Sequence, residues 1–319
     1  MNYAILCDMS QHIAVDIGGT QIRAALFEDD RIIPSKIEKI STSGENPALD
    51  RLCGLITKIW PKNEPVSAIG IAAAGATDPY QGVVISAPNI TGWVNVPLRE
   101  HIQNCFPVDV YIGNDANLAA IGEWKYGAGK GHHHLIYLTI STGIGGGIIL
   151  DDRLLLGQQG LAGEMGHITV LPDGPMCGCG KKGHFEALAS GTAIARWTKN
   201  ELERGVKSSL SKDKTITSRT VAAAAQKGDH LAIEAFDRAG HYLGMVLADF
   251  LHLFNPTTVI LGGGVSQTGD LLLVPAQKAL QSFILHPQYL ANFSLTRASL
   301  GDEAGLIGAL VLARSGQIH

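Results

Sequence analysis

The sequence predicts an α/β protein built from two related halves. Short apolar runs that suit buried strands alternate along the chain with segments of helical periodicity. A strand, a glycine turn and a second strand occur at residues 12–33 and again at 135–155. Glycine supplies 38 of the 319 residues, which indicates many tight turns and pockets lined by backbone.

The first half is expected to begin with a β-hairpin, because a second apolar strand follows the glycine turn directly. Residues 47–60 have helical spacing after Pro47, and residues 97–106 are typical of a helix that begins at Pro97. The stretch 76–97 is rich in glycine and proline and is predicted to be a loop. The remaining expected elements are strands at 66–75 and 108–115 and a helix at 116–129.

The second half repeats the hairpin and then becomes mainly helical. A glycine-rich loop with two cysteines covers residues 172–184. Helices are predicted at about 187–204, 217–228 and 230–254, a buried strand at 257–265, and a closing helix at 302–316. We expect one domain at 1–115, completed by the C-terminal helix 302–319, and a larger domain at 116–301 that carries the cysteine loop.

Composition excludes several classes of protein. The chain is 45% hydrophobic and 17% charged, which rules out global disorder, and its net charge of −4 argues against nucleic acid as the main partner. No uncharged apolar run reaches about 18 residues, so no membrane span is predicted. The N-terminal sequence has no signal-peptide pattern, which favours a reducing cytoplasm. There, Cys7, Cys53 and Cys105 are expected to be buried reduced thiols.

Three glycine turns, each after an apolar strand, point to phosphate binding. Glycine lets the backbone approach a ligand and direct N–H groups at phosphate oxygens, and a threonine hydroxyl adds a donor. The spacing fits neither the dinucleotide-binding pattern G-x-G-x-x-G nor the P-loop. The residues concerned are Asp16, Gly18, Gly19 and Thr20 in the first turn, Thr142, Gly143, Gly145, Gly146 and Gly147 in the second, and Gly262, Gly263 and Gly264 in the third.

From about His12 to its C-terminus the chain resembles the ROK family of sugar kinases and repressors, which belongs to the actin-like and hexokinase-like ATPases. The three glycine turns match the family's two phosphate motifs and its adenosine-side motif. The most specific match is Gly163–His167 followed by Cys177–Gly180. The resemblance implies two actin-like, ribonuclease-H-like domains with a cleft between them, ATP and Mg²⁺ as cofactors, and a homodimer or higher homo-oligomer.

Asp115 is the candidate catalytic residue. Read alone, an aspartate between a strand and a helix is most often a helix N-cap, although a carboxylate at a strand end also suits a general base. The matching family segment makes it the base that activates a sugar hydroxyl, while Asp16 matches a position at the magnesium–phosphate end of the site. The resemblance also implies sugar contacts from Asn89, Asn114, Glu164, His167 and Glu186.

A soft-ligand cluster in the cysteine loop suggests zinc. His167, Cys177, Cys179 and His184 supply two thiolates and two imidazoles, a donor set that tetrahedral Zn²⁺ accepts. Four protein ligands leave no open position, so the metal is expected to be structural and to hold the loop that presents the sugar residues. The family normally has a third cysteine where His184 stands.

The hypothesis favoured by these residues is ATP-dependent phosphorylation of a hexose, with glucose converted to glucose 6-phosphate. Kinases of N-acetylmannosamine or N-acetylglucosamine remain an alternative. A sugar-responsive regulator of the same family is a second class, although only 11 residues precede His12 and Asp115 is intact. Residues 132–134, a triple histidine, are expected to be an exposed turn, and Trp93 and Trp124 packing residues.

Overall fold

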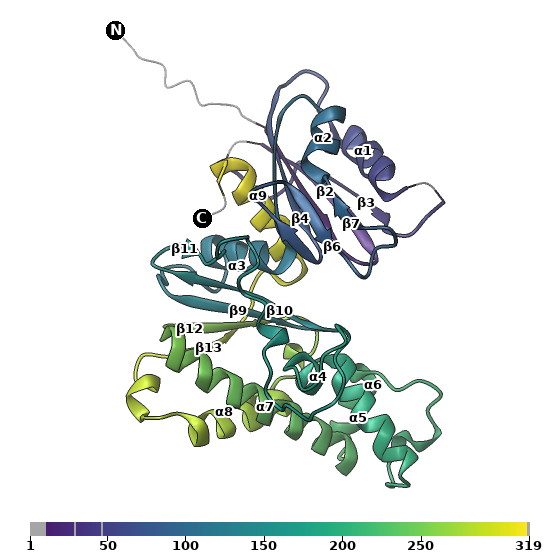
Figure 1. Ribbon diagram of the computed structural model, residues 1–319, viewed down its shortest axis with the longest axis vertical. Coiled ribbons are helices and arrows are strands. Elements are labelled where there is room, and N and C mark those ends of the chain that lie inside the picture. The colour runs from purple at the N-terminus through teal and green to yellow at the C-terminus, as the bar shows by residue number, and fades with distance from the viewer. Residues whose placement is uncertain (1–10, 29, 46, 318–319) are drawn as a thin grey trace. The chain divides into compact units, whose positions relative to one another are not determined.

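The computed structural model describes residues 11–28, 30–45 and 47–317 (Figure 1). These residues divide into two compact units. The first comprises the described residues of Met1–Lys130, Arg153–Gly163 and Asp302–His319, and the second comprises Gly131–Asp152 and Glu164–Gly301. Cys7 lies outside the described residues. Within them, no helix has the length and apolar character needed to cross a membrane.

The first unit is built on a five-stranded sheet with the order β3-β2-β1-β4-β8. β1 pairs antiparallel with β2 and parallel with β4, and β8 continues the parallel part. A second, three-stranded sheet has the order β5-β6-β7. The elements are β1 (Gln11–Ile17), β2 (Gln21–Glu28), β3 (Lys36–Ser41), α1 (Ala48–Ile59), β4 (Val66–Ala73), β5 (Ala76–Asp78), β6 (Val83–Ser86), β7 (Val94–Val96), α2 (Leu98–Cys105), β8 (Asp109–Asn114), α3 (Asp115–Tyr126) and α9 (Ala304–Ser315).

Strand β4 shows how this sheet is covered on both faces. Ile69 and Ile71 belong to the core cluster that includes the buried leucines and isoleucines of α1 and α2. Gly70, which points to the other face, lies so close to α9 that a Cβ there would clash with the backbone of Ala309. Alternate residues of a strand face opposite sides, so large side chains meet α1 and α2 while a small one lets α9 approach closely.

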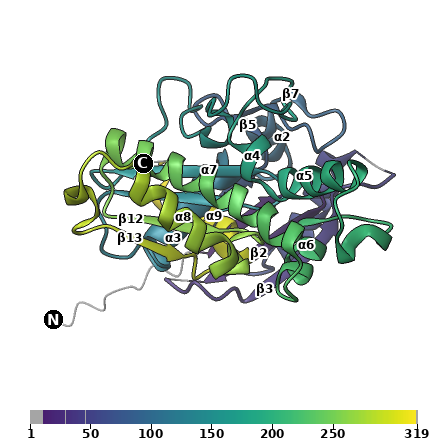
Figure 2. The same cartoon turned by 90° about the horizontal axis from the view of Figure 1, so that it is seen from below.

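The second unit repeats the same topology. Its sheet has the order β11-β10-β9-β12-β13, in which β9 and β10 form an antiparallel hairpin and β9, β12 and β13 run parallel. Helices α7 and α8 pack side by side against each other (Figure 2). The elements of this unit are β9 (Leu135–Ile140), β10 (Ile144–Leu150), α4 (Glu186–Ala189), α5 (Gly191–Glu203), α6 (Ser218–Ala225), α7 (His230–Phe254), β12 (Thr258–Gly262), α8 (Asp270–Phe283) and β13 (Ser294–Arg297). The edge strand β11 (Arg153–Leu154) falls in the segment that is counted with the first unit.

Three details of the predicted secondary structure were wrong. The stretch 76–97 is not a loop, because β5, β6 and β7 pair with one another there. The expected single helix at 187–204 is broken at Ser190, whose extended backbone (ψ 167°) lets its side chain cap α5. The edge strand β3 was not predicted, since its side chains are largely exposed and its sequence does not alternate clearly.

The division into units differs from the predicted boundary at Asp115. Helix α3, which begins at Asp115, belongs to the first unit because it packs against α9. Gly122 of α3 and Gly308 of α9 make this close packing feasible, since a Cβ on either would clash with the backbone of the other helix. The first unit also takes in Arg153–Gly163.

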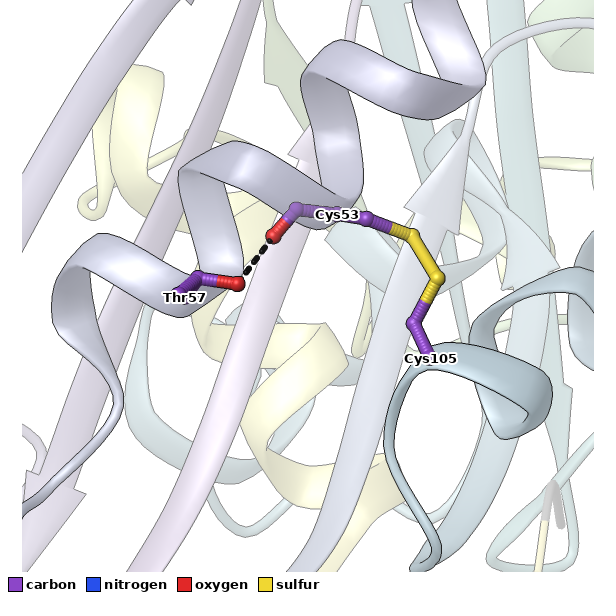
Figure 3. Close-up of a disulfide and its surroundings, with 3 residues drawn as sticks. All are labelled: Cys53, Thr57 and Cys105. Carbon is purple, nitrogen blue, oxygen red and sulfur yellow. Dashed lines mark hydrogen bonds between the residues drawn. A yellow bond between two sulfur atoms is a disulfide. The ribbon is translucent and has the colours of Figure 1, made fainter.

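The expectation of reduced thiols is wrong for two of the three cysteines. Cys53 of α1 and Cys105 of α2 form a disulfide across a sequence separation of 52 residues (Figure 3). The sequence alone does not pair them, because only the packing of α1 beside α2 brings the two positions together.

Candidate active site

Asp115 lies at the junction between β8 and α3 and is half-buried. Asn114, not Asp115, caps the helix: its side-chain oxygen accepts hydrogen bonds from the N–H groups of Ala116 and Asn117, each at 3.0 Å. The Asn114 amide nitrogen donates to Gly75 O at 3.0 Å and to Asp115 Oδ1 at 3.1 Å. Asn114 therefore caps the helix and orients the carboxylate of Asp115 at the same time.

Asp16 is the penultimate residue of β1, just before the first glycine turn, and is held by an arginine. Arg23 Nη2 lies 2.6 Å from Asp16 Oδ2, and Arg23 Nη1 lies 2.8 Å from Glu303 Oε1. Burial opposes the charge of Arg23, but its hydrogen bond to Asp16 and the surrounding carboxylates outweigh burial and raise the pKa of the guanidinium. The sequence reasoning missed Arg23, although the predicted hairpin places it directly opposite Asp16.

The first glycine turn packs against Asn89. Gly18 N–H donates to Gln21 O at 2.9 Å, which closes the turn between β1 and β2. A Cβ on Gly19 would lie 2.9 Å from Asn89 Cβ, so only glycine fits at this distance. Gly19 and Asn89 line a pocket of about 470 Å³ together with the segment Thr42–Glu45 and Arg51. The structure therefore brings the predicted sugar residue Asn89 to the first glycine turn.

The second glycine turn joins β9 to β10 and contacts Glu186. Glu186 Oε2 accepts a hydrogen bond from the backbone N–H of Ile144 at 2.9 Å, and a Cβ on Gly143 would clash with the same oxygen. The turn is also tied to the first residues of α5, because Gly191 N–H donates to Ser141 O and the Thr192 hydroxyl donates to Thr142 O. Thr192 was not predicted, and its contact depends on the helix break at Ser190.

The third glycine turn follows β12, next to the second. β9 and β12 are adjacent parallel strands, so the turns at Thr142–Gly143 and Gly262–Gly264 lie at the same end of the sheet, whereas Gly145, Gly146 and Gly147 lie within β10. Gly263 has a φ of +82°, and a Cβ there would clash with the backbone of Ile140. Ligands of α/β proteins bind at the carboxyl ends of parallel strands, which is where these two turns lie.

The four predicted metal ligands come together in the cysteine loop. One ligand atom from each of His167, Cys177, Cys179 and His184 lies within 4.8 Å of the others. Cys177 Sγ is 3.7 Å from His167 Nδ1, and Cys179 Sγ is 3.2 Å from His184 Nδ1. Two thiols and two imidazoles that converge in this way fit a tetrahedral Zn²⁺ ion.

Glu186 joins this cluster to the second glycine turn. Its Oε1 accepts a hydrogen bond from Cys177 Sγ at 3.4 Å, while its Oε2 holds the backbone of Ile144. Burial, together with side-chain hydrogen bonds to Cys179 and Glu186, outweighs the opposing backbone hydrogen bond from Cys179 and raises the pKa of the Cys177 thiol to about 11. Glu164, the other predicted glutamate, is exposed and precedes the short 3₁₀ turn Met165–His167.

The remaining aromatic and histidine candidates have structural partners. Trp93 and Trp124 are buried, in agreement with their expected packing role. In the triple histidine, His132 contacts Thr257, His133 contacts Asp152 and His134 contacts Asp151.

The sequence model of the ROK family matches residues 12–315. This chain belongs to the ROK family. It is 37% identical over 313 residues to a glucokinase of Streptomyces coelicolor, covering 96% of this chain and 98% of the relative. It is 34% identical to a glucokinase of Thermotoga maritima, covering 93% and 95%.

A solved structure of a ROK family glucokinase from Streptomyces griseus, in complex with glucose and AMPPNP, has a TM-score of 0.81 to this chain at 37% identity. The similarity covers 96% of this chain and 100% of that one. The predicted family and fold class are thus confirmed.

Proposed function

We propose that this protein is an ATP-dependent hexose kinase that converts glucose to glucose 6-phosphate. The observation that carries the proposal is the junction of β8 and α3, where Asn114 orients the half-buried carboxylate of Asp115. Support comes from the glycine turns at the ends of β1, β9 and β12 and from a relative solved with glucose and an ATP analogue.

In the proposed reaction a sugar hydroxyl attacks the γ-phosphorus of ATP. The new O–P bond forms as the bond to the bridging oxygen of ADP breaks, and Asp115 accepts the hydroxyl proton. Asn89, Asn114, Glu164, His167 and Glu186 are the proposed sugar contacts. The backbone N–H groups of the glycine turns stabilise the phosphate charge, and little covalent chemistry is required of the protein.

Two metals belong to the proposal. Mg²⁺ neutralises phosphate charge when bound with ATP, and the carboxylate of Asp16 beside the first glycine turn suits its hydration shell. Zn²⁺ is proposed as a structural ion held by His167, Cys177, Cys179 and His184, because four protein ligands leave no position for a reacting water. Histidine in place of the family's usual third cysteine keeps a donor type that zinc accepts.

Two further properties are proposed from the family. We propose a homodimer, which sedimentation velocity tests directly. We also place the protein in the cytoplasm, the compartment that supplies ATP to a sugar kinase.

A substrate panel tests the proposed function. ADP release is measured with glucose, mannose, fructose, N-acetylmannosamine and N-acetylglucosamine at equal concentrations, with Asp115→Asn as the blank. The proposal expects the highest kcat/KM with glucose. A preference for an N-acetyl sugar would replace glucose as the substrate, and sugar binding without turnover on any member would favour the regulator class instead.

A further inference from the structure

A second group of metal-ligand side chains lies in the first unit, on the helices α1 and α2 that cover one face of its five-stranded sheet. It consists of Cys53 on α1 with His101 and Cys105 on α2. One ligand atom from each lies within 4.8 Å of the other two. The group is separate from the zinc cluster of the second unit and from Asp115, and the proposed kinase reaction does not use it. Its two sulfur atoms form the disulfide drawn in Figure 3.

His101 is the unexplained member of this group. It stands four residues before Cys105 on α2, a spacing that places both side chains on one helix face. Its Nε2 atom is buried and, among the residues that the structure describes, has no hydrogen-bond partner. Leaving a buried polar atom unsatisfied costs about 1–3 kcal/mol, so an imidazole in this state calls for a partner that the disulfide form does not provide.

We propose that Cys53, His101 and Cys105 form a second Zn²⁺ site when the disulfide is reduced. Two thiolates and one imidazole are a soft donor set that suits Zn²⁺, and the fourth position is left to water. Because the same two sulfur atoms form either the disulfide or the metal bonds, the oxidised and zinc-bound states exclude each other.

The chemistry of the exchange balances with a dithiol as reductant. One thiolate of the dithiol attacks a sulfur of the Cys53–Cys105 bond, which forms a mixed disulfide and expels the other cysteine as a thiolate. The second thiolate of the dithiol then attacks the mixed disulfide, which releases the remaining cysteine and the dithiol in its oxidised, cyclic form. This transfers two electrons and leaves Cys53 and Cys105 as thiols, whose two protons are displaced when Zn²⁺ binds. Cys105 is exposed and Cys53 is half-buried, so a reductant can reach the bond.

The backbone positions of Cys53 and Cys105 allow both the disulfide and the zinc-bound state. The Cα atoms of Cys53 and Cys105 are 6.5 Å apart, near the upper end of the range of about 4.4–6.8 Å for disulfides. Tetrahedral Zn–S bonds of about 2.3 Å place two sulfur atoms about 3.8 Å apart, which side-chain rotation at this Cα separation allows.

The disulfide is one of several contacts that hold the two helices together. Trp60, just after α1, stacks on Phe106, just after α2, with ring centroids 4.7 Å apart and planes 16° from parallel. Leu52 and Ile102, one residue from Cys53 and His101, are fully buried in the core of the unit. Reduction therefore leaves α1 and α2 in place to present three ligands.

Zinc stoichiometry of the full-length chain tests the proposal. One sample is oxidised and the other is reduced with a phosphine that is then removed without air. Thiol titration in denaturant checks the two states, which are expected to have three and five thiols from the five cysteines. Both samples are loaded with ZnCl₂, desalted and analysed for zinc. The reduced chain is expected to hold one more zinc ion than the oxidised chain.

Variants assign that additional ion to this group. The double variant Cys53→Ser, Cys105→Ser should show no increase on reduction, and His101→Gln should bind the additional ion at least about tenfold more weakly. The oxidised His101→Gln chain is the folding control, because its zinc content must equal that of the oxidised parent. Co²⁺ loading gives a second readout, because the thiolate charge-transfer band should gain intensity on reduction, above the band that the cluster with Cys177 and Cys179 gives in both samples.

Equal zinc contents in the oxidised and reduced chains would overturn the proposal. So would an increase that persists in the double serine variant, or an additional ion that His101→Gln binds with unchanged affinity.

Discussion

The carboxylate of Asp115 accepts hydrogen bonds from the side chain of Asn114 and from the backbone N–H of Ala116. Asn114 uses its oxygen for the N-terminus of α3 and its amide nitrogen for Gly75 and Asp115. The structure thus gives Asn114 an orienting role, whereas the family resemblance implied only a sugar contact for this residue. The N-cap reading of Asp115 fails because the residue before it already fills that position.

Replacing Asp115 with asparagine should lower turnover by about 10²–10⁴-fold while glucose binding persists. Asparagine keeps the shape of the side chain but cannot accept the hydroxyl proton, a loss worth about 10²–10⁴ in kcat. Glucose affinity is measured by calorimetry and kcat by ADP release. Asp109→Asn, at the exposed start of the same strand, is the matched control and should keep normal kcat. Near-normal turnover of Asp115→Asn would refute its role as base.

Glu186 and Glu164 are both proposed sugar contacts, and within the described part of the chain Glu186 is the one that contacts a glycine turn. Glutamine at position 186 can accept through only one of its two terminal atoms, so the bond from Ile144 N–H or from Cys177 Sγ is lost. A hydrogen bond to a charged group contributes about 1.5–3 kcal/mol, so we expect KM for both glucose and ATP to rise about 10- to 100-fold. Glu164→Gln should change the KM for glucose alone. An unchanged KM for ATP in the Glu186→Gln variant would show that Glu186 does not support the turn.

At the scale of elements, helix α7 depends on a strongly bonded cap. Asp229 accepts hydrogen bonds from the N–H groups of Ala232 and Ser209 and from the hydroxyls of Ser208 and Ser209. Burial disfavours its charged form, but these bonds outweigh burial and lower the pKa of Asp229 to about 2. The carboxylate therefore stabilises the folded state at neutral pH.

The sign of the pH dependence follows from that lowered pKa. The contribution of Asp229 is complete above its unfolded pKa of about 3.9 and is lost as the pH falls towards its folded value of about 2. Asp229→Ala should lower the free energy of unfolding by about 0.5–2 kcal/mol at pH 7, the usual effect of losing an N-cap. Urea unfolding at pH 7 and pH 2.5 measures this, and the difference between parent and variant should shrink at the lower pH. A difference independent of pH would contradict the assigned pKa.

Elements with a strong local pattern could be predicted, and those defined by distant partners could not. The hairpin at the first glycine turn and the helix α7 follow from periodicity and turn residues. Strands β5 and β7 have three residues each, too few to show alternation, and are recognisable only through their pairing with β6. The Cys53–Cys105 bond likewise depends on a contact between two helices, whereas the Asp16–Arg23 ion pair lies across the predicted hairpin and could have been predicted from it.

At the scale of the whole molecule, the proposed functional residues are divided between the units. Asp16, Asn89 and Asp115 belong to the first, whereas the second and third glycine turns, Glu186 and the zinc cluster belong to the second. The disulfide lies in the first unit, and the proposed zinc cluster lies in the second. Each unit therefore has its own local stabiliser.

Hydrogen exchange should show that these two supports act separately. A disulfide across 52 residues stabilises by about 4 kcal/mol in the chain-entropy account, so Cys53→Ser with Cys105→Ser should speed exchange in α1 and α2. Removing zinc with a chelator should speed exchange in the loop from Glu164 to Glu186, because the ligands lose their common centre and Glu186 loses its neighbour Cys177. Mass spectrometry of peptides from the oxidised chain measures both effects at pH 7. Each treatment should leave the protection of the other unit unchanged, and a chelator that accelerates exchange in α1 and α2 as strongly as in the cysteine loop would contradict this division of supports.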